Sequence, residues 1–250
     1  MAVFTVGPNS RMYWDQYDLT PTLKDGSFEI STETLDKTAW NDTTRVSRAG
    51  LDSVSISASG HQNLGTGEIE DILKSELGTD DSIIAMGANV SAEGDIVYVS
   101  KGMMSQLTPV QGAVGDQAAY GFAAQSSGGW FRGKLMADKA ARTSTSVSAG
   151  IQLGVIAATQ KMHASLHIFA VSGTNPTLDV TVKSDDNGSY TSATTRLTFA
   201  QATAAGSQYL GPTLGPAGAD DYWRIAWTIG GTATPTFNFA VVFGHDINGG

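Results

Sequence analysis

The chain has 250 residues, a formal net charge of −9 and no cysteine, so disulfides, thiolate metal sites and cysteine nucleophiles are excluded. Its 15 Lys and Arg residues are scattered, and an acidic chain of this kind does not wrap nucleic acid, because neutralising phosphates takes clustered basic side chains. The first residues lack the pattern of a signal peptide and no apolar run approaches the roughly 18 residues of a membrane helix, so we expect no membrane insertion.

Glycine is abundant, at 29 residues, and charged residues make up only 16% of the chain. This polar but weakly charged composition suits all-β proteins that pack against copies of themselves. A chain of this length can bury roughly three quarters of its unfolded surface, which supports one large β domain or two small ones.

Short strands open the chain. The segment from Gly26 to Ser31 has apolar residues on one side, and Asp52 to Gly60 alternates apolar side chains with serines, as expected of a half-buried strand. Residues 38–47 lack a clean period, so we predict a long loop there that carries an exposed or half-exposed Trp40.

One convincing helix is predicted, between Gly67 and Leu77. Thr66 can cap it, Gly78 can end it, and its apolar residues form a single stripe. The stripe consists of Ile69, Ile72, Leu73 and Leu77. We expect this helix to lie on a sheet whose further strands cover residues 82–86, 95–106, 117–125 and 129–136.

Residues 137–149 are small and polar, which makes them the best candidate for a linker. They predict a boundary between a first β domain, residues 1–137, and a second β domain, residues 138–250, each of plausible domain size. Both halves place a strand-forming segment before a Gly-rich stretch, SISASG and AWTIGG, which hints at duplication, although the halves do not align convincingly.

The second half has a more regular strand pattern. Residues 161–171 and 178–182 alternate, an Asn-Gly turn follows at residues 185–188, and residues 206–221 are predicted to form a long loop.

The densest core signal comes last, from Asp221 to Gly244. We predict a hairpin there, with its turn bounded by Gly230, Gly231 and Pro235. Its two arms would present facing rows of large apolar side chains, namely Trp223, Ile225, Trp227 and Ile229 against Phe237, Phe239, Val241 and Phe243.

Patterns for catalysis or metal binding are weak throughout. His163 and His167 share a strand face, where residues four apart lie roughly 13 Å from each other, so a shared metal is disfavoured. The run from Asp185 to Asn187 resembles a calcium loop only in composition, and a turn is the better interpretation. Because GxSxG, P-loop and dinucleotide motifs are also missing, we expect no catalytic residues, cofactor or metal, and no enzyme.

Three tryptophans, Trp14, Trp40 and Trp130, have the side chain that stacks on sugars. Tryptophan is equally suited to cores and is enriched at subunit interfaces, and we favour those roles over sugar binding.

Three segments of the chain resemble the major tail tube proteins of long-tailed, non-contractile (siphovirus-like) bacteriophages. The first runs from Asp18-Leu19-Thr20 through a strand and a Thr-rich loop to Gly50-Leu51 and the Ser-rich strand ending at Gly60. The second is Gly112 to Met136, and the third combines LHIFAVSGTNPTLDVTVKSDDNGSY with YWRIAWTIGG. The resemblance covers most of the chain, but as a pattern of strands and turns without a catalytic motif.

The resemblance implies a mainly β, sandwich- or barrel-like tail tube fold with one short flanking helix, with or without duplication. It implies a virion protein, assembled in the host cytoplasm, that forms stacked rings and so the tail tube through which the genome is delivered. Its implied partners are copies of itself, the tape measure protein and the tail terminator, while genomic DNA passes without specific binding. Rings would be hexamers, or trimeric pseudo-hexamers if the domain is duplicated. The sizes of the two halves favour the trimer, and the hexamer stays open.

In that family a long loop between early strands reaches a neighbouring ring, and by position it would lie here at about Leu35 to Arg48. The residues predicted for this inter-ring loop are Leu35, Asp36, Lys37, Thr38, Ala39, Trp40, Asn41, Asp42, Thr43, Thr44 and Arg45. The alternative function is a carbohydrate- or receptor-binding β-sandwich module of a virion or cell surface, which would need clustered aromatics on a solvent-facing sheet. An enzyme would need a cleft with two convergent carboxylates.

Overall fold

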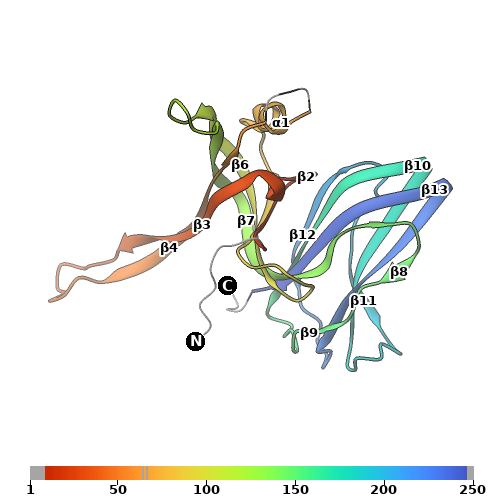
Figure 1. Ribbon diagram of the computed structural model, residues 1–250. Coiled ribbons are helices and arrows are strands. Elements are labelled where there is room, and N and C mark those ends of the chain that lie inside the picture. The colour runs from red at the N-terminus through yellow and green to blue at the C-terminus, as the bar shows by residue number, and fades with distance from the viewer. Residues whose placement is uncertain (1–8, 64, 66, 247–250) are drawn as a thin grey trace. The chain divides into compact units, whose positions relative to one another are not determined.

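The structure is a computed structural model that describes residues 9–63, 65 and 67–246 (Figure 1). Strands dominate these residues and one short α-helix accompanies them, so the predicted mainly β, sandwich-like fold is confirmed. The N-terminal strands are β1 (Arg11–Trp14), β2 (Tyr17–Asp18), β3 (Leu23–Asp36), β4 (Ser47–His61), β5 (Ser82–Gly87), β6 (Ile96–Gln111) and β7 (Ala119–Arg142). The C-terminal strands are β8 (Ser146–Val147), β9 (Ile151–Gln152), β10 (Lys161–Asp185), β11 (Thr194–Thr198), β12 (Gly206–Leu214) and β13 (Tyr222–His245).

The described residues form two compact units. The first takes in those of Met1–Thr20, Ile83–Val99 and Phe131–Gly250, and the second consists of Pro21–Ser82 and Ser100–Trp130. The predicted division into domains of residues 1–137 and 138–250 stays a prediction.

Two very long strands, β10 and β13, organise the first unit. They pair antiparallel along their whole length, from Met162 opposite His245 to Asp185 opposite Tyr222. The register shifts several times near the middle, between Ile168 and Thr177. At the matching place in β13, Ala233 and Thr234 have positive φ values of 56° and 53°. Such a conformation is uncommon for non-glycine residues and reverses the chain locally, so both strands bend back there.

The bend divides the paired strands between the two layers of a sandwich. Layer A contains the first half of β10 and the last half of β13, flanked by β12 and the end of β7. Layer B contains the other halves, flanked by β11, β8 and β9. Large apolar side chains fill the space between the layers, among them Trp223, Ile225, Phe239 and Phe243, all fully buried.

The predicted terminal hairpin is wrong, because its two arms do not pair with each other as neighbouring strands. Their apolar rows do pack against each other, as predicted. β13 is assigned as one strand through Gly230 and Pro235, and each of its halves pairs with β10 instead of with the other half. The two apolar rows nevertheless face each other across the core. The signal of Gly-Gly followed by Pro therefore marks a turn between layers, where we expected a turn between neighbouring strands.

Other segments also differ from expectation. The two strands predicted at 117–125 and 129–136 are parts of β7, which continues to Arg142, so residues 137–142 are strand and no linker. The predicted loop at 206–221 contains the nine-residue strand β12. β12 pairs only with β10 among the described residues and is mostly half-buried, so its side chains lack a strong apolar alternation.

The second unit is a sheet of β3, β4, the first part of β7 and the part of β6 from Ser100 onward, with the helix α1 (Ile69–Glu76). Ile69 and Leu73 are buried, Ile72 is half-buried and Leu77 is exposed, so the predicted stripe is only partly covered. Glu68 is the N-cap residue and makes no side-chain capping bond, while Thr66, the predicted cap, lies outside the described residues.

Candidate interaction arm

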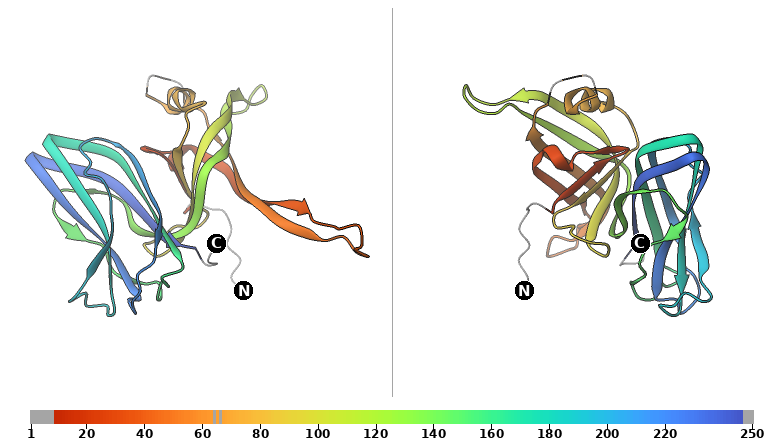
Figure 2. Two further views of the ribbon diagram at one scale, coloured as in Figure 1. Left: turned by 180° about the vertical axis from the view of Figure 1, so that it is seen from behind. Right: turned by 45° about the vertical axis from the view of Figure 1, so that its right-hand side comes forward.

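The most unusual feature of the second unit is a long two-stranded ribbon formed by β3 and β4. The two strands pair from Leu23 opposite Gly60 to Asp36 opposite Ser47. β7 supports β4 only from Ser55 to His61. We call residues 30–54, the part without a third strand, the arm. In Figures 1 and 2 it extends away from the other strands of its unit.

The two faces of the ribbon differ in chemistry. On one face hydroxyl groups bond across the strands, with 2.9 Å between the Oγ atoms of Ser31 and Ser53 and 2.9 Å between those of Ser27 and Ser57. On the other face apolar pairs lie opposite each other, Phe28 with Ile56 and Ile30 with Val54. The apolar face is buried at Val54 and Ile56, whereas Ile30 is already exposed.

The end of the arm is an ordered loop held by local hydrogen bonds. The N–H of Val46 donates to Thr38 Oγ1 at 3.0 Å, and the N–H of Thr38 donates to Asp36 Oδ1 at 2.9 Å. Arg45 Nε lies 3.2 Å from Asp36 Oδ2. Hydrogen bonds from Thr38, with a further one from Arg45, hold the pKa of Asp36 below its usual value. These contacts fix the loop that presents Trp40.

Large apolar side chains are exposed along the whole arm, which is costly for a ribbon that stays in water. They are Ile30 (39% exposed), Leu35 (44%), Trp40 (105%), Val46 (39%) and Leu51 (81%). An isolated two-stranded ribbon is also only marginally stable in water. A partner surface that covers the arm would bury these side chains and hold the ribbon straight, with Trp40 as the natural anchor.

The residues predicted for the inter-ring loop all lie at the end of this arm. Leu35 and Asp36 end β3, and the remaining nine, up to Arg45, belong to the connection between β3 and β4. Their contact with a neighbouring ring stays a prediction. The length of the two strands was missed, because the apolar residues Leu35 and Leu51 fall out of the period-2 pattern set by Ile30 and Val54.

The histidines and tryptophans that were considered for metal or sugar binding lie outside the loop at the end of the arm, except for Trp40. His163 and His167 lie on β10, as the alternation predicted, and are buried. Trp14 is fully buried and so unavailable for sugar stacking, Trp130 is half-buried and Trp40 is exposed. Within the described part of the chain, no group of three or more His, Cys, Asp or Glu side chains is placed to hold a metal ion.

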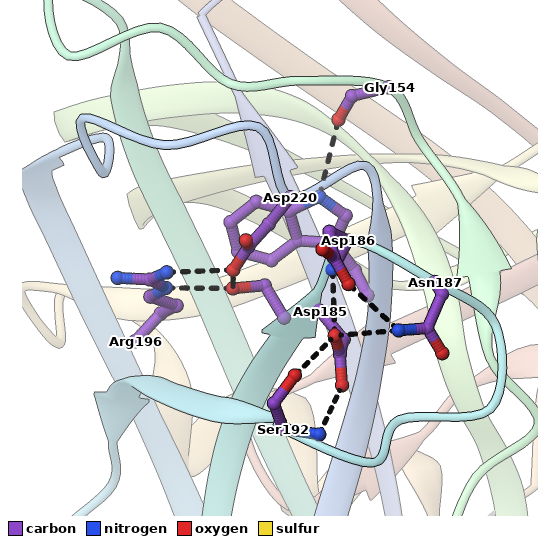
Figure 3. Close-up of polar contacts among 9 residues, drawn as sticks. Gly154, Asp185, Asp186, Asn187, Ser192, Arg196 and Asp220 are labelled. Carbon is purple, nitrogen blue, oxygen red and sulfur yellow. Dashed lines mark hydrogen bonds and ion pairs between the residues drawn. The ribbon is translucent and has the colours of Figure 1, made fainter.

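Asp185 stabilises the turn that resembles a calcium loop (Figure 3). Its carboxylate accepts hydrogen bonds from the N–H of Asp186 at 2.8 Å, from the N–H of Ser192 at 2.9 Å and from the Ser192 hydroxyl at 3.1 Å. Burial raises the pKa of Asp185, but the donors of Ser192 and Asp186 outweigh it and hold that pKa below its usual value. Because the Asp185 carboxylate accepts these hydrogen bonds within the turn, the structure supports the interpretation of this segment as a turn.

Comparisons with known proteins give distant structural neighbours only. No family model and no curated protein matches the sequence. A chain from the virion of a native gene transfer agent particle is 18% identical with a TM-score of 0.40, over 50% of this chain and 96% of that chain. A chain from the tail of an empty gene transfer agent particle with C6 symmetry is 18% identical with a TM-score of 0.36, over 44% and 81%. The SPP1 Dit protein, described as a hub adsorption apparatus protein of phages that infect Gram-positive hosts, is 9% identical with a TM-score of 0.33, over 95% and 99%.

Scores this low transfer no function to the present chain. In the part of the chain that the structure describes, no helix is long and apolar enough to cross a membrane.

Proposed function

We propose that the chain is a structural protein of a phage tail that self-assembles into stacked rings forming the tail tube. The observation that carries the proposal is the arm, an exposed ribbon whose most exposed large apolar side chain is that of Trp40. The sequence resemblance to tail tube proteins supports the same role, because it places the inter-ring loop at this ribbon. The chain would act in the virion, after assembly in the host cytoplasm.

Ring closure would use the free edges of the sheet in the second unit. Among the described residues β3 pairs with β4 alone, so no strand lies along its other edge. Such an edge is a template for a strand of another chain. Head-to-tail pairing of this kind closes into a ring when the rotation per copy allows it, and stacked rings form a tube. The rings would be trimeric pseudo-hexamers or hexamers, with the trimer favoured if residues 138–250 duplicate the first domain.

The net charge of −9 suits the wall of a conduit. Repeated in every copy, it repels the phosphate backbone and gives DNA no cationic surface on which to bind. Genomic DNA would then pass through the tube without specific contacts. The tape measure protein and the tail terminator are the other partners that this role implies.

Removing the outer part of the arm, which carries the predicted inter-ring loop, tests the proposal. In the variant, residues 35–48 are replaced by Asn-Gly, which suits a two-residue hairpin turn. We expect it to fold, shown by a cooperative thermal unfolding transition like that of the intact chain, and to lose ring stacking in sedimentation and electron microscopy. Tube formation equal to that of the intact chain would contradict a role of residues 35–48 in ring stacking.

A second candidate, the carbohydrate- or receptor-binding module, has one observation in its favour. The exposed indole of Trp40 has the chemistry to stack on a sugar, although it stands alone at the end of the arm. Glycan-array binding by a chain that does not self-associate, abolished by Trp40→Ala, would favour this module over the tube.

A further inference from the structure

Asp15 connects several segments of the first unit. It lies in the turn between β1 and β2, with a φ of 48°. Its carboxylate accepts hydrogen bonds from the N–H of Ile83 at 2.8 Å and from the hydroxyl of Ser207 at 2.5 Å. Its own N–H donates to the carbonyl of Ile83 at 2.9 Å. One residue thereby joins the β1–β2 turn to β5 and β12.

The fourth hydrogen bond of Asp15 fixes the protonation of His167 on β10. The backbone carbonyl of Asp15 lies 2.8 Å from His167 Nδ1, and since a carbonyl can only accept, Nδ1 carries the hydrogen. In the neutral ring Nε2 then holds a lone pair. His167 is fully buried, and Nε2 has no hydrogen-bond partner among the described residues.

Among the described residues, no acceptor lies within hydrogen-bond distance of His167 Nε2. The ring packs against Tyr13, at 5.7 Å between ring centroids, and against Phe169 of its own strand at 6.4 Å, with Ser207 and Ala240 opposite it in register. The carboxylate of Asp15 accepts its two hydrogen bonds at Oδ1 and makes none with Nε2. A buried N–H without an acceptor is costly, and a buried charge more so.

Burial accordingly lowers the pKa of His167, against the opposing effects of the hydrogen bond to Asp15 and of the Asp15 charge. Burial also lowers the pKa of His163, the second buried histidine of β10, but this ring has different partners. Nδ1 of His163 lies 3.1 Å from the Tyr209 hydroxyl, and Nε2 lies 3.3 Å from a carboxylate oxygen of Asp246. His163 can therefore accommodate a proton beside Asp246, whereas His167 cannot do so without leaving its place.

We infer that Asp15 and His167 form a proton-sensitive latch that holds the β1–β2 turn on β10 near neutral pH and releases it on acidification. The released histidine takes up a proton with an ordinary pKa of about 6.5, while the latched one excludes it. Opening is therefore coupled to proton uptake below about pH 6.5. The equilibrium constant for opening of the turn rises about tenfold at pH 5.5.

Hydrogen exchange on the full chain measures this directly. Exchange of the amides of residues 12–18, corrected for the intrinsic effect of pH, gives the opening constant at pH 7.5 and pH 5.5. We expect the tenfold rise in the unmodified chain. His167→Asn keeps a side-chain donor near the position of Nδ1 and does not titrate, so it should abolish the rise. His61→Asn, at an exposed histidine of β4, is the matched control and should preserve it.

Two outcomes would overturn the latch. One is an opening constant that does not change with pH in the unmodified chain, and the other is a rise of the same size in His167→Asn. If that variant does not fold, nuclear magnetic resonance titration of the unmodified chain replaces it. Titration of His167 near pH 6.5 while residues 12–18 stay protected from exchange would also contradict the latch.

Discussion

The indole of Trp223 stacks on the ring of Phe243, with centroids 5.0 Å apart and planes inclined by 26°, although the two residues lie near opposite ends of one strand. Trp227 and Phe239 make a second contact across the core nearer the bend, edge to face, with centroids 5.7 Å apart and planes inclined by 78°. A straight strand would separate its ends by roughly 3.3 Å per residue, so both contacts require β13 to fold back across the core. The core of the first unit is thus built by one strand that faces itself.

Truncation of this contact should be costly. Phe243→Ala removes a fully buried ring from between the layers, and we expect the free energy of unfolding to fall by about 3–5 kcal/mol. Urea denaturation followed by circular dichroism measures the loss. Trp40→Ala, at an exposed site, should change stability by less than about 0.5 kcal/mol. Equal effects of the two substitutions would contradict the folded-back strand.

The bend itself depends on Gly231. Its φ is +121°, and a Cβ placed there would lie 2.7 Å from the carbonyl oxygen of Asn175. Gly231→Ala should therefore destabilise the chain by about 1–3 kcal/mol. Gly218→Ala is the control, because its Cβ would meet nothing closer than Asp220 Oδ1 at 3.9 Å. A thermal melt of Gly231→Ala that matches the control would show that the bend tolerates a side chain.

Stability should fall in acid through Asp185 and Asp220. Hydrogen bonds from Ser184 and Arg196 hold the pKa of Asp220 below its usual value, as those of Ser192 and Asp186 do for Asp185. Both carboxylates stabilise the fold while ionised, so their contribution is complete above the unfolded pKa of about 3.9 and is lost as pH falls through the lower folded values. Melting temperatures between pH 5 and pH 2 should drop more steeply for the unmodified chain than for Asp185→Asn. Parallel curves would mean that Asp185 contributes no such linkage.

Trp40 should matter for assembly and little for folding. Trp40→Ala removes the most exposed anchor of the arm, and we expect the concentration for half-maximal assembly to rise at least about tenfold, as for loss of an interface hot spot. Val114→Ala removes an equally exposed apolar side chain, 108% exposed, from the connection between β6 and β7 and serves as the control. Light scattering over a dilution series measures both. A larger effect of Val114→Ala would move the interface away from the arm.

Periodicity predicted the mainly β fold because most strands cover one face and expose the other. It identified the apolar rows of β13 for the same reason, since Trp223 and Phe243 both point into one core. It could not identify their strand partners. Whether a turn joins neighbours in a sheet or passes between two layers depends on the pairing with β10, which is distant in sequence.

The candidate site shows a different limit. The position of the inter-ring loop came from the resemblance, while the length of the ribbon that carries it was missed because most of the arm is exposed, and little burial there enforces an alternating pattern. His167 shows the converse case. It was predicted as a polar residue on a strand face. That face is buried, because Tyr13 of β1 packs against the His167 ring and Phe169, two residues further along β10, lies beside it. Burial imposed by distant segments leaves no local signal.

Negative-stain electron microscopy of the purified full chain over a concentration series tests the central claim most directly. The account predicts rings or hollow tubes that become longer with concentration, with a rotational symmetry that decides between three and six copies. Isolated particles the size of a single chain at every concentration, with a matching monomer mass in sedimentation, would contradict self-assembly into a tube.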